Sequence, residues 1–101
     1  MNNETHKVIV AKDLEDLIPA FMGNRHKELD SLRVALSAAD FEQLGRLGHR
    51  MRGVGNSYGF ELVSVFGERI EASARSGDRA AIEACVAAYR DYLAGVQISY
   101  E

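Results

Sequence analysis

Four segments of the chain carry apolar residues at the three- and four-residue spacing of amphipathic helices. They predict helices over residues 19–36, 41–57, 58–75 and 79–94. The apolar stripes are Met22, Leu29, Leu32 and Leu36; Leu44, Leu47, Met51, Val54 and Tyr58; Phe60, Val63, Phe66, Ile70 and Ala74; and Ile82, Cys85, Val86, Tyr89 and Leu93. Because the connections are short, successive helices run antiparallel. The pattern predicts an all-α, up-and-down antiparallel four-helix bundle.

Residues at the helix ends support these boundaries. Asp40 is a good N-cap for the second helix, and Ser76-Gly77-Asp78 ends the third helix and caps the fourth. Asp13 is a plausible N-cap for an earlier apolar segment that Pro19 interrupts. Proline fits the first turn of a helix and not its interior. Either a short extra helix therefore ends near Ile18 and a new one begins at Pro19, or a single helix kinks there.

Both ends of the chain contain short segments of strand-like sequence. Val8-Ile9-Val10 is β-branched, and residues 96–100 alternate apolar and polar side chains. These segments predict short extended termini, which would be able to pair with each other. The preceding residues 1–7 are polar, and we expect them to form a frayed terminus.

Composition limits the class of protein. The 101 residues correspond to a single domain, expected over residues 1–101 with its core at about 12–95. A net charge of -3 argues against nucleic acid as the main partner. The single cysteine excludes an intrachain disulfide and fits a reducing compartment. No apolar run reaches the roughly twenty residues of a membrane span, and the polar N-terminus is not a signal peptide, so we expect a cytoplasmic protein without a membrane partner.

His49 lies in the middle of the second predicted helix, on its polar side. At about 100° per residue, its side chain falls about 170° from the centre of the apolar stripe, so it should point to solvent. The residues that share its face are Glu42, Gly45, Arg46, Arg52, Gly53 and Asn56.

The same helix contains glycines at positions 45, 48, 53 and 55. Each glycine costs about 0.5–1 kcal/mol relative to alanine within a helix. Gly45, Gly48 and Gly53 are helical or sequence neighbours of His49, and the missing side chains predict a cleared surface that lets a partner reach the imidazole. The alternative reasons for such glycines are close helix packing or a break in the helix, and they fit Gly55 best because Gly55 points nearer the core.

Arginines are concentrated around His49. Arg46, Arg50 and Arg52 lie within a chain that is net acidic, and guanidinium groups bind phosphate oxygens well. Taken alone, these arginines fit a solvated helix face better than a phosphate site. Together with the exposed histidine and the glycines, they favour a surface that handles phosphate.

The segment His49-Arg50-Met51-Arg52-Gly53, followed by Gly59, resembles the signature of histidine phosphotransfer (HPt) domains. In that signature, histidine is followed by any residue, a large apolar residue, a lysine or arginine, a glycine, and a second glycine six positions on. The resemblance extends over residues 12–95 through the chain length, the bundle pattern and the apolar positions.

The resemblance implies a phosphorelay intermediate of bacterial two-component signalling. His49 would be the phospho-acceptor. Arg52 would stabilise the phosphate, at a position where lysine is the commoner residue in the family. Gly53 would give access to the ring, Gly59 would form the turn before the next helix, and Asn56 would have a supporting role. The partners would be a histidine kinase and the receiver domain of a response regulator, which would bring the Mg²⁺. The chain itself would need no cofactor, no metal and no ATP site, and it would not be an enzyme.

One other class of function remains open. In it, the bundle is an interaction module that docks a signalling partner, and His49 is never phosphorylated. The remaining histidines, His6 and His26, are expected to be ordinary surface residues, and their spacing does not suit a zinc site. The glycines and Arg52 favour the phosphorelay interpretation, because a surface used only for docking needs no bare histidine at its centre.

Overall fold

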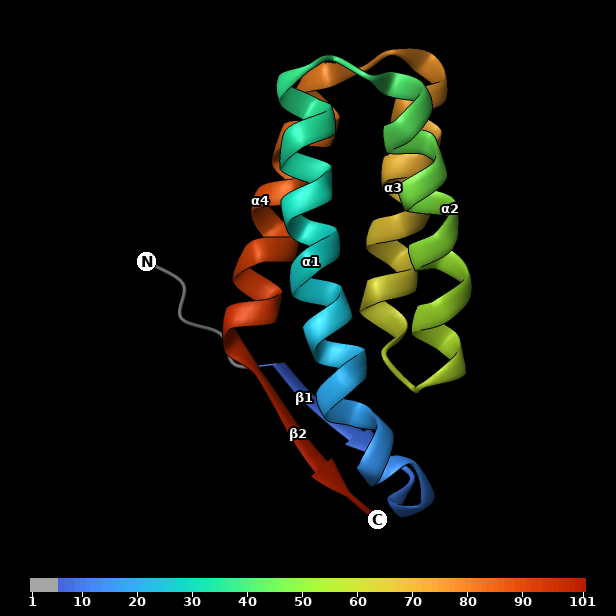
Figure 1. Ribbon diagram of the computed structural model, residues 1–101, viewed down its shortest axis with the longest axis vertical. Helices are drawn as coiled ribbons and strands as arrows, with labels where there is room; N and C mark the ends of the chain where they lie inside the picture. Colours follow the sequence, from blue (N-terminus) through green and yellow to red (C-terminus); the bar gives the residue numbers. More distant parts are fainter. Residues whose placement is uncertain (1–5) are drawn as a thin grey trace.

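The computed structural model describes residues 6–101 and contains the predicted bundle (Figure 1). Four helices, α1 (Ile18–Ser37), α2 (Phe41–Ser57), α3 (Glu61–Ser76) and α4 (Arg79–Gly95), run alternately up and down. Their apolar stripes meet in one core, in which Leu32, Leu44 and Ile70 are fully buried. The prediction of an antiparallel four-helix bundle is therefore confirmed.

The two ends of the chain form a small parallel ribbon beside the bundle. Strand β1 (His6–Val10) pairs with strand β2 (Val96–Tyr100), with Val8 opposite Ile98. The prediction of extended termini is confirmed, and the structure adds that they pair. The expectation of a frayed terminus over residues 1–7 is wrong for His6 and Lys7, which belong to β1; residues 1–5 lie outside the described part of the chain.

The chain enters the bundle through a change of helix type at Pro19. A 3₁₀ helix, η1 (Lys12–Leu17), is followed by α1, in which Pro19 occupies the first turn. The first of the two alternatives, a short helix followed by a new one, is the correct one. Asp13 is not the N-cap, because the 3₁₀ helix already begins at Lys12 and no side chain caps it.

The predicted caps of α2 and α4 and the predicted end of α3 are present. The carboxylate of Asp40 accepts a hydrogen bond from the Gln43 backbone N–H at 3.0 Å, and Asp78 caps α4 in the same way. Gly77 ends α3 with a φ of 69°. The third helix begins at Glu61 and not at residue 58, because residues 58–60 form a turn in which Gly59 has a φ of 85°.

One buried polar cluster connects α1 with α4. The Tyr89 hydroxyl donates a hydrogen bond to Glu28 Oε1 at 2.8 Å, and Arg25 Nε lies 3.1 Å from the same oxygen. Burial raises the pKa of the Glu28 carboxyl, while Arg25 opposes that rise. Because an unpaired buried charge is costly, these contacts favour the packing in which Tyr89 of α4 reaches Glu28 of α1.

Candidate functional site

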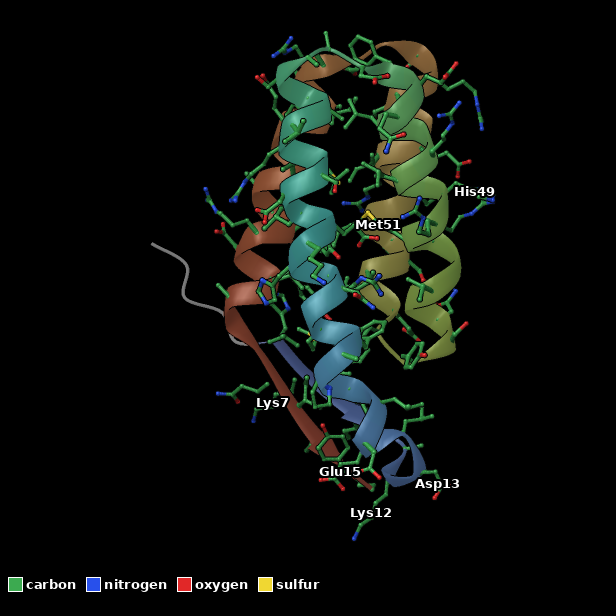
Figure 2. The ribbon with its side chains drawn as sticks, viewed as in Figure 1. Lys7, Lys12, Asp13, Glu15, His49 and Met51 are labelled. Atoms are coloured by element: carbon green, nitrogen blue, oxygen red, sulfur yellow. The ribbon has the colours of Figure 1, made fainter. Side chains whose placement is uncertain are left out.

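His49 lies at mid-length on α2, on the side away from the core. Its side chain is 64% exposed, whereas Leu47 and Met51 on the opposite stripe are buried. Figure 2 shows the imidazole on the outer flank of the bundle. The prediction that this ring points to solvent is confirmed.

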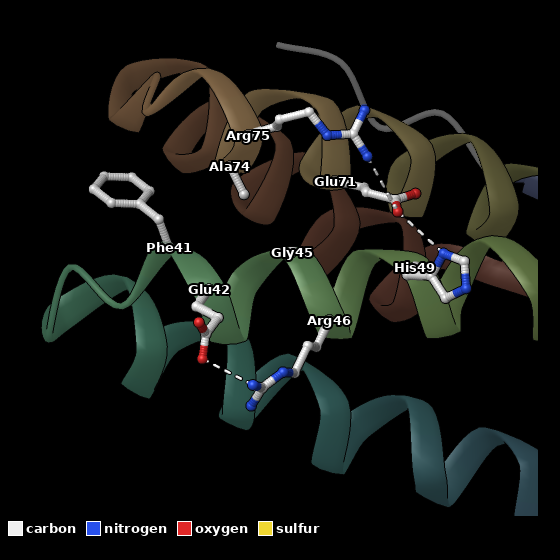
Figure 3. Close-up of a pocket in the computed structure, with 8 residues that line it drawn as sticks. All are labelled: Phe41, Glu42, Gly45, Arg46, His49, Glu71, Ala74 and Arg75. Carbon is white, nitrogen blue, oxygen red and sulfur yellow. Dashed lines mark hydrogen bonds and ion pairs between the residues drawn. The ribbon is translucent and has the colours of Figure 1, made fainter.

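A carboxylate on the neighbouring helix α3 contacts the imidazole of His49. Glu71 of α3 places Oε2 3.0 Å from His49 Nδ1, and its side chain is only 16% exposed (Figure 3). The carboxylate also attracts two guanidinium groups, with Arg52 Nη1 3.6 Å from Oε1 and Arg75 Nη2 3.7 Å from Oε2. Glu71 is therefore the centre of a charged cluster that includes the histidine.

These contacts determine which ring nitrogen carries the proton. Arg52 Nη2 lies 3.3 Å from His49 Nδ1, so Arg52 and Glu71 both approach the same nitrogen. If Nδ1 held a lone pair, it would face a carboxylate oxygen at 3.0 Å without a hydrogen between them. We therefore assign the proton to Nδ1, which donates to Glu71, and the attraction of Arg52 is to the carboxylate. The lone pair is then on Nε2, which points away from Glu71 (Figure 3).

Two of the predicted glycines leave space beside the ring. A Cβ on Gly53 would meet nothing within 4 Å, and one on Gly45 would only touch Ala74 Cβ at 3.8 Å. Gly53 is exposed and Gly45 is half-buried. The helix surface on both sides of His49 is thus open to a partner.

Gly48 has a different role, and its prediction as an access residue is wrong. It is buried, and a Cβ there would lie 2.7 Å from both the Gly67 carbonyl oxygen and the Glu71 backbone nitrogen. Successive residues of a helix are rotated by about 100° around its axis. Gly48 therefore faces α3, while the next residue, His49, faces solvent. Gly48 therefore lets the two backbones approach closely, and it brings Glu71 next to His49.

The same close approach continues along the α2–α3 hairpin. A Cβ on Gly67 would lie 2.5 Å from the Gly48 carbonyl oxygen, and one on Gly55 would lie 2.6 Å from the Ser64 backbone nitrogen. The alternative role of Gly55 in helix packing is correct. The backbones of α2 and α3 are therefore closely packed behind the histidine.

A groove of about 500 Å³ opens between α2 and α3, with His49 at one end (Figure 3). Gly45 and Ala74 are among the small residues that line it, and the exposed Arg46 forms an ion pair with Glu42 at 2.8 Å. The groove offers a concave surface beside the free Nε2. The residues that line it are Phe41, Glu42, Gly45, Arg46, His49, Glu71, Ala74 and Arg75.

The other predicted residues are not all gathered around His49. Arg50 lines a separate groove with Asn24 and Lys27 of α1, so the expectation that it surrounds the histidine is wrong. The next position along a helix turns to another flank. Asn56 is exposed on the last turn of α2, and no hydrogen bond joins it to His49 within residues 6–101. Gly59 lies in the turn before α3, as expected.

Sequence reasoning missed Glu71 and Arg75. Both lie on α3, and Glu71 is 22 residues from His49, so no spacing within one helix connects them. The only usable signal is the antiparallel α2–α3 hairpin with its glycines.

In the described part of the chain, no cluster of three or more histidine, cysteine, aspartate or glutamate residues is arranged to hold a metal ion. None of the helices in that part is long and apolar enough to cross a bilayer.

Comparison with known proteins identifies the class that this fold and this site define. The family model of the Hpt domain matches residues 12–98, which is most of the chain. The chain belongs to the Hpt domain family. Proteins of this family are phosphocarriers, not kinases, and they work with histidine kinases and response regulators in phosphorelay signalling. No curated protein and no solved structure gave a significant match.

Proposed function

We propose that this protein is a phosphorelay intermediate that carries a phosphoryl group on His49 Nε2. It accepts the group from the aspartyl phosphate of a receiver domain or from a histidine kinase, and it passes the group to the aspartate of a response regulator. The observation that supports this most strongly is the exposed imidazole whose Nδ1 is held by Glu71 at 3.0 Å. A cytoplasmic location, where these partners act, is part of the proposal.

The transfer step uses the free lone pair. Nε2 attacks phosphorus, an N–P bond forms, and the P–O bond to the aspartyl carboxylate breaks with its electrons remaining on that carboxylate. The ring becomes positively charged, and its Nδ1 proton stays on the hydrogen bond to Glu71. A carboxylate stabilises this charge as it develops, which lowers the barrier. Transfer to the next aspartate is the reverse of the same step.

The arginines and the partner share the negative charge of the phosphoryl group. Arg52 Nη2 lies 3.3 Å from Nδ1, the second nitrogen of the reacting ring, so a guanidinium is already close to the imidazole that would carry the phosphoryl group. Phosphoryl transfer depends mainly on positioning and charge stabilisation, so this chain needs no general base at Nε2. The receiver domain brings Mg²⁺ and its acidic pocket, and the arginines of this surface complement that pocket.

The test is a transfer assay with the intact chain and a panel of receiver domains carrying a labelled aspartyl phosphate. We expect label to appear on this protein in an acid-labile, alkali-stable form, as a phosphoramidate should. Nitrogen-15 NMR of the labelled ring should show the phosphoryl group on Nε2. A chain that takes no label from any receiver or kinase, while it still binds a receiver, would be the non-phosphorylated interaction module instead.

Glu71 is expected to fix the ring tautomer. In Glu71→Ala the Nδ1 proton loses its acceptor, so the ring is free to hold its proton on either nitrogen, and the emerging positive charge loses its counter-ion. A hydrogen bond to a charged group contributes about 1.5–3 kcal/mol, so transfer should slow by about tenfold or more. Glu71→Gln keeps a hydrogen-bond acceptor but loses the charge, so its transfer rate should lie between those of the wild type and Glu71→Ala. An unchanged tautomer ratio by nitrogen-15 NMR would contradict this role.

Arg52 is expected to stabilise the phosphorylated form. Arg52→Ala removes a charge-assisted contact to the phosphoryl oxygens, and we expect about tenfold slower transfer or a shorter phosphohistidine lifetime. Arg50→Ala is the matched control, because Arg50 is also exposed on α2 but lines a separate groove beside α1. Equal kinetics for the two variants would remove Arg52 from the mechanism.

A further inference from the structure

The two edges of the terminal ribbon have different surroundings. The edge of β1 that faces away from β2 lies beside the turn before α3, where the Ile9 carbonyl oxygen is 3.8 Å from the position of a Cβ on Gly59. The outer edge of β2 has no backbone partner within residues 6–101. Figure 1 shows β2 along the margin of the molecule.

The hydrogen bonds at the end of the ribbon show which backbone groups this outer edge presents. The Glu101 N–H donates to the Val10 oxygen at 3.1 Å, and the Lys12 N–H donates to the Glu101 oxygen at 2.9 Å. Backbone groups of successive residues in a strand point to opposite edges, so residues 97 and 99 face β1 as Glu101 does. The N–H and C=O groups of Val96, Ile98 and Tyr100 therefore point outward.

Nothing in the sequence of β2 protects this edge. Val96-Gln97-Ile98-Ser99-Tyr100 contains no charge, no proline and no glycine, whereas natural edge strands are commonly protected by such residues. The side chains of Val96, Ile98 and Tyr100 are only half-buried against the bundle. A sheet of two strands is also marginal by itself. Both the backbone edge and the apolar face thus remain incompletely covered.

We propose that β2 pairs antiparallel with β2 of a second copy, around a twofold axis at Ile98, to form a continuous four-stranded sheet. In this register Ile98 faces Ile98 of the partner subunit, and Val96 faces Tyr100 of the partner subunit. Each of these is a hydrogen-bonded pair that exchanges two backbone bonds, which gives about six bonds in all. The half-buried face gains a cross-strand contact between an aromatic and a β-branched side chain.

The strand itself argues for a second copy as the occupant. Its apolar side chains at 96, 98 and 100 and its uncharged polar ones at 97 and 99 are placed symmetrically about Ile98, so the pattern of the strand matches itself under a twofold rotation. The edge carries no charge that would require a partner of opposite sign. Figure 2 shows His49 on the flank of the bundle that faces away from this ribbon, so both histidines of the dimer stay accessible.

A charge-swap experiment tests the edge and its register together. Gln97 and Ser99 are exposed on the outer face, and in the dimer each lies opposite the other in a non-hydrogen-bonded pair, where side chains are closest. The double variant Gln97→Glu/Ser99→Glu places like charges opposite each other. Gln97→Glu/Ser99→Lys is the matched control, which places opposite charges there. In both variants position 97 is a glutamate opposite Lys7 of β1 and position 99 lies opposite the uncharged Ile9, so neither variant places like charges directly opposite each other within one subunit.

The readout is the mass of the intact chain by sedimentation equilibrium from about 1 μM to about 1 mM. We expect a concentration-dependent dimer for the wild type and for Gln97→Glu/Ser99→Lys, and a dissociation constant at least about tenfold weaker for Gln97→Glu/Ser99→Glu. Amide exchange should slow at Ile98 and Tyr100 as the dimer forms, with circular dichroism unchanged. A wild-type chain that stays monomeric, or a dimer equally strong in both variants, would overturn the proposal.

Discussion

His49→Gln is expected to abolish phosphorylation, with a loss of at least about a thousandfold in labelling. A glutamine amide nitrogen has no free lone pair for attack on phosphorus, whereas Nε2 of the imidazole does. The variant should fold normally, because the His49 side chain is 64% exposed and is not part of the hydrophobic core. Its labelling is measured with the receiver that gives the fastest transfer to the wild type, and circular dichroism checks the fold.

His26→Gln is the matched control for this experiment. His26 is an exposed histidine on α1, so its replacement should leave both labelling and stability unchanged. Mass spectrometry of the labelled wild type should place the phosphoryl group on the peptide that contains His49. Label that persists in His49→Gln would show that another residue carries the group.

Alanine substitutions at Gly48 and Gly53 are expected to have opposite effects on stability. A Cβ at Gly48 would lie 2.7 Å from two backbone atoms of α3, so α2 and α3 would have to separate. Such overpacking costs about 1–3 kcal/mol, which exceeds the gain of about 0.5–1 kcal/mol from the better helix former. The free energy of unfolding should therefore fall in Gly48→Ala.

The Cβ added in Gly53→Ala would have no atom within 4 Å, so the only effect on stability is the gain from alanine's higher helix propensity. Its free energy of unfolding should rise by about 0.5–1 kcal/mol. Urea denaturation of both variants beside the wild type measures the two changes. Gly48→Ala with wild-type stability would show that the hairpin relaxes easily, and the account of Gly48 as a close-packing residue would be wrong.

Much of the bundle follows from local sequence. The second helix runs from Phe41 to Ser57 as predicted, because Asp40 caps its start and its apolar stripe is regular. The misses lie where local signals compete. Asp13 resembles a cap, but the chain is already helical at Lys12, and the third helix starts later because the turn at Gly59 uses residues 58–60.

The candidate site could be predicted only as far as one helix allows. The exposure of His49 is a property of α2 alone, and periodicity gives it correctly. Glu71 and Arg75 come from α3, and their approach depends on the packing of the hairpin, which sequence spacing does not describe. The same gap explains Gly48, because a missing side chain looks identical in sequence whether it faces a partner protein or a neighbouring helix.

Glu71 also affects how readily the phosphoryl group would leave His49. Its carboxylate already occupies Arg52 and Arg75 before any phosphoryl group arrives, so these cations are partly neutralised in the empty protein. An incoming anion must share them with Glu71 and gains less than it would from unengaged guanidinium groups. For the transfer proposed on His49, this smaller gain means that the phosphorylated and unphosphorylated states differ less in free energy, which favours transfer in both directions.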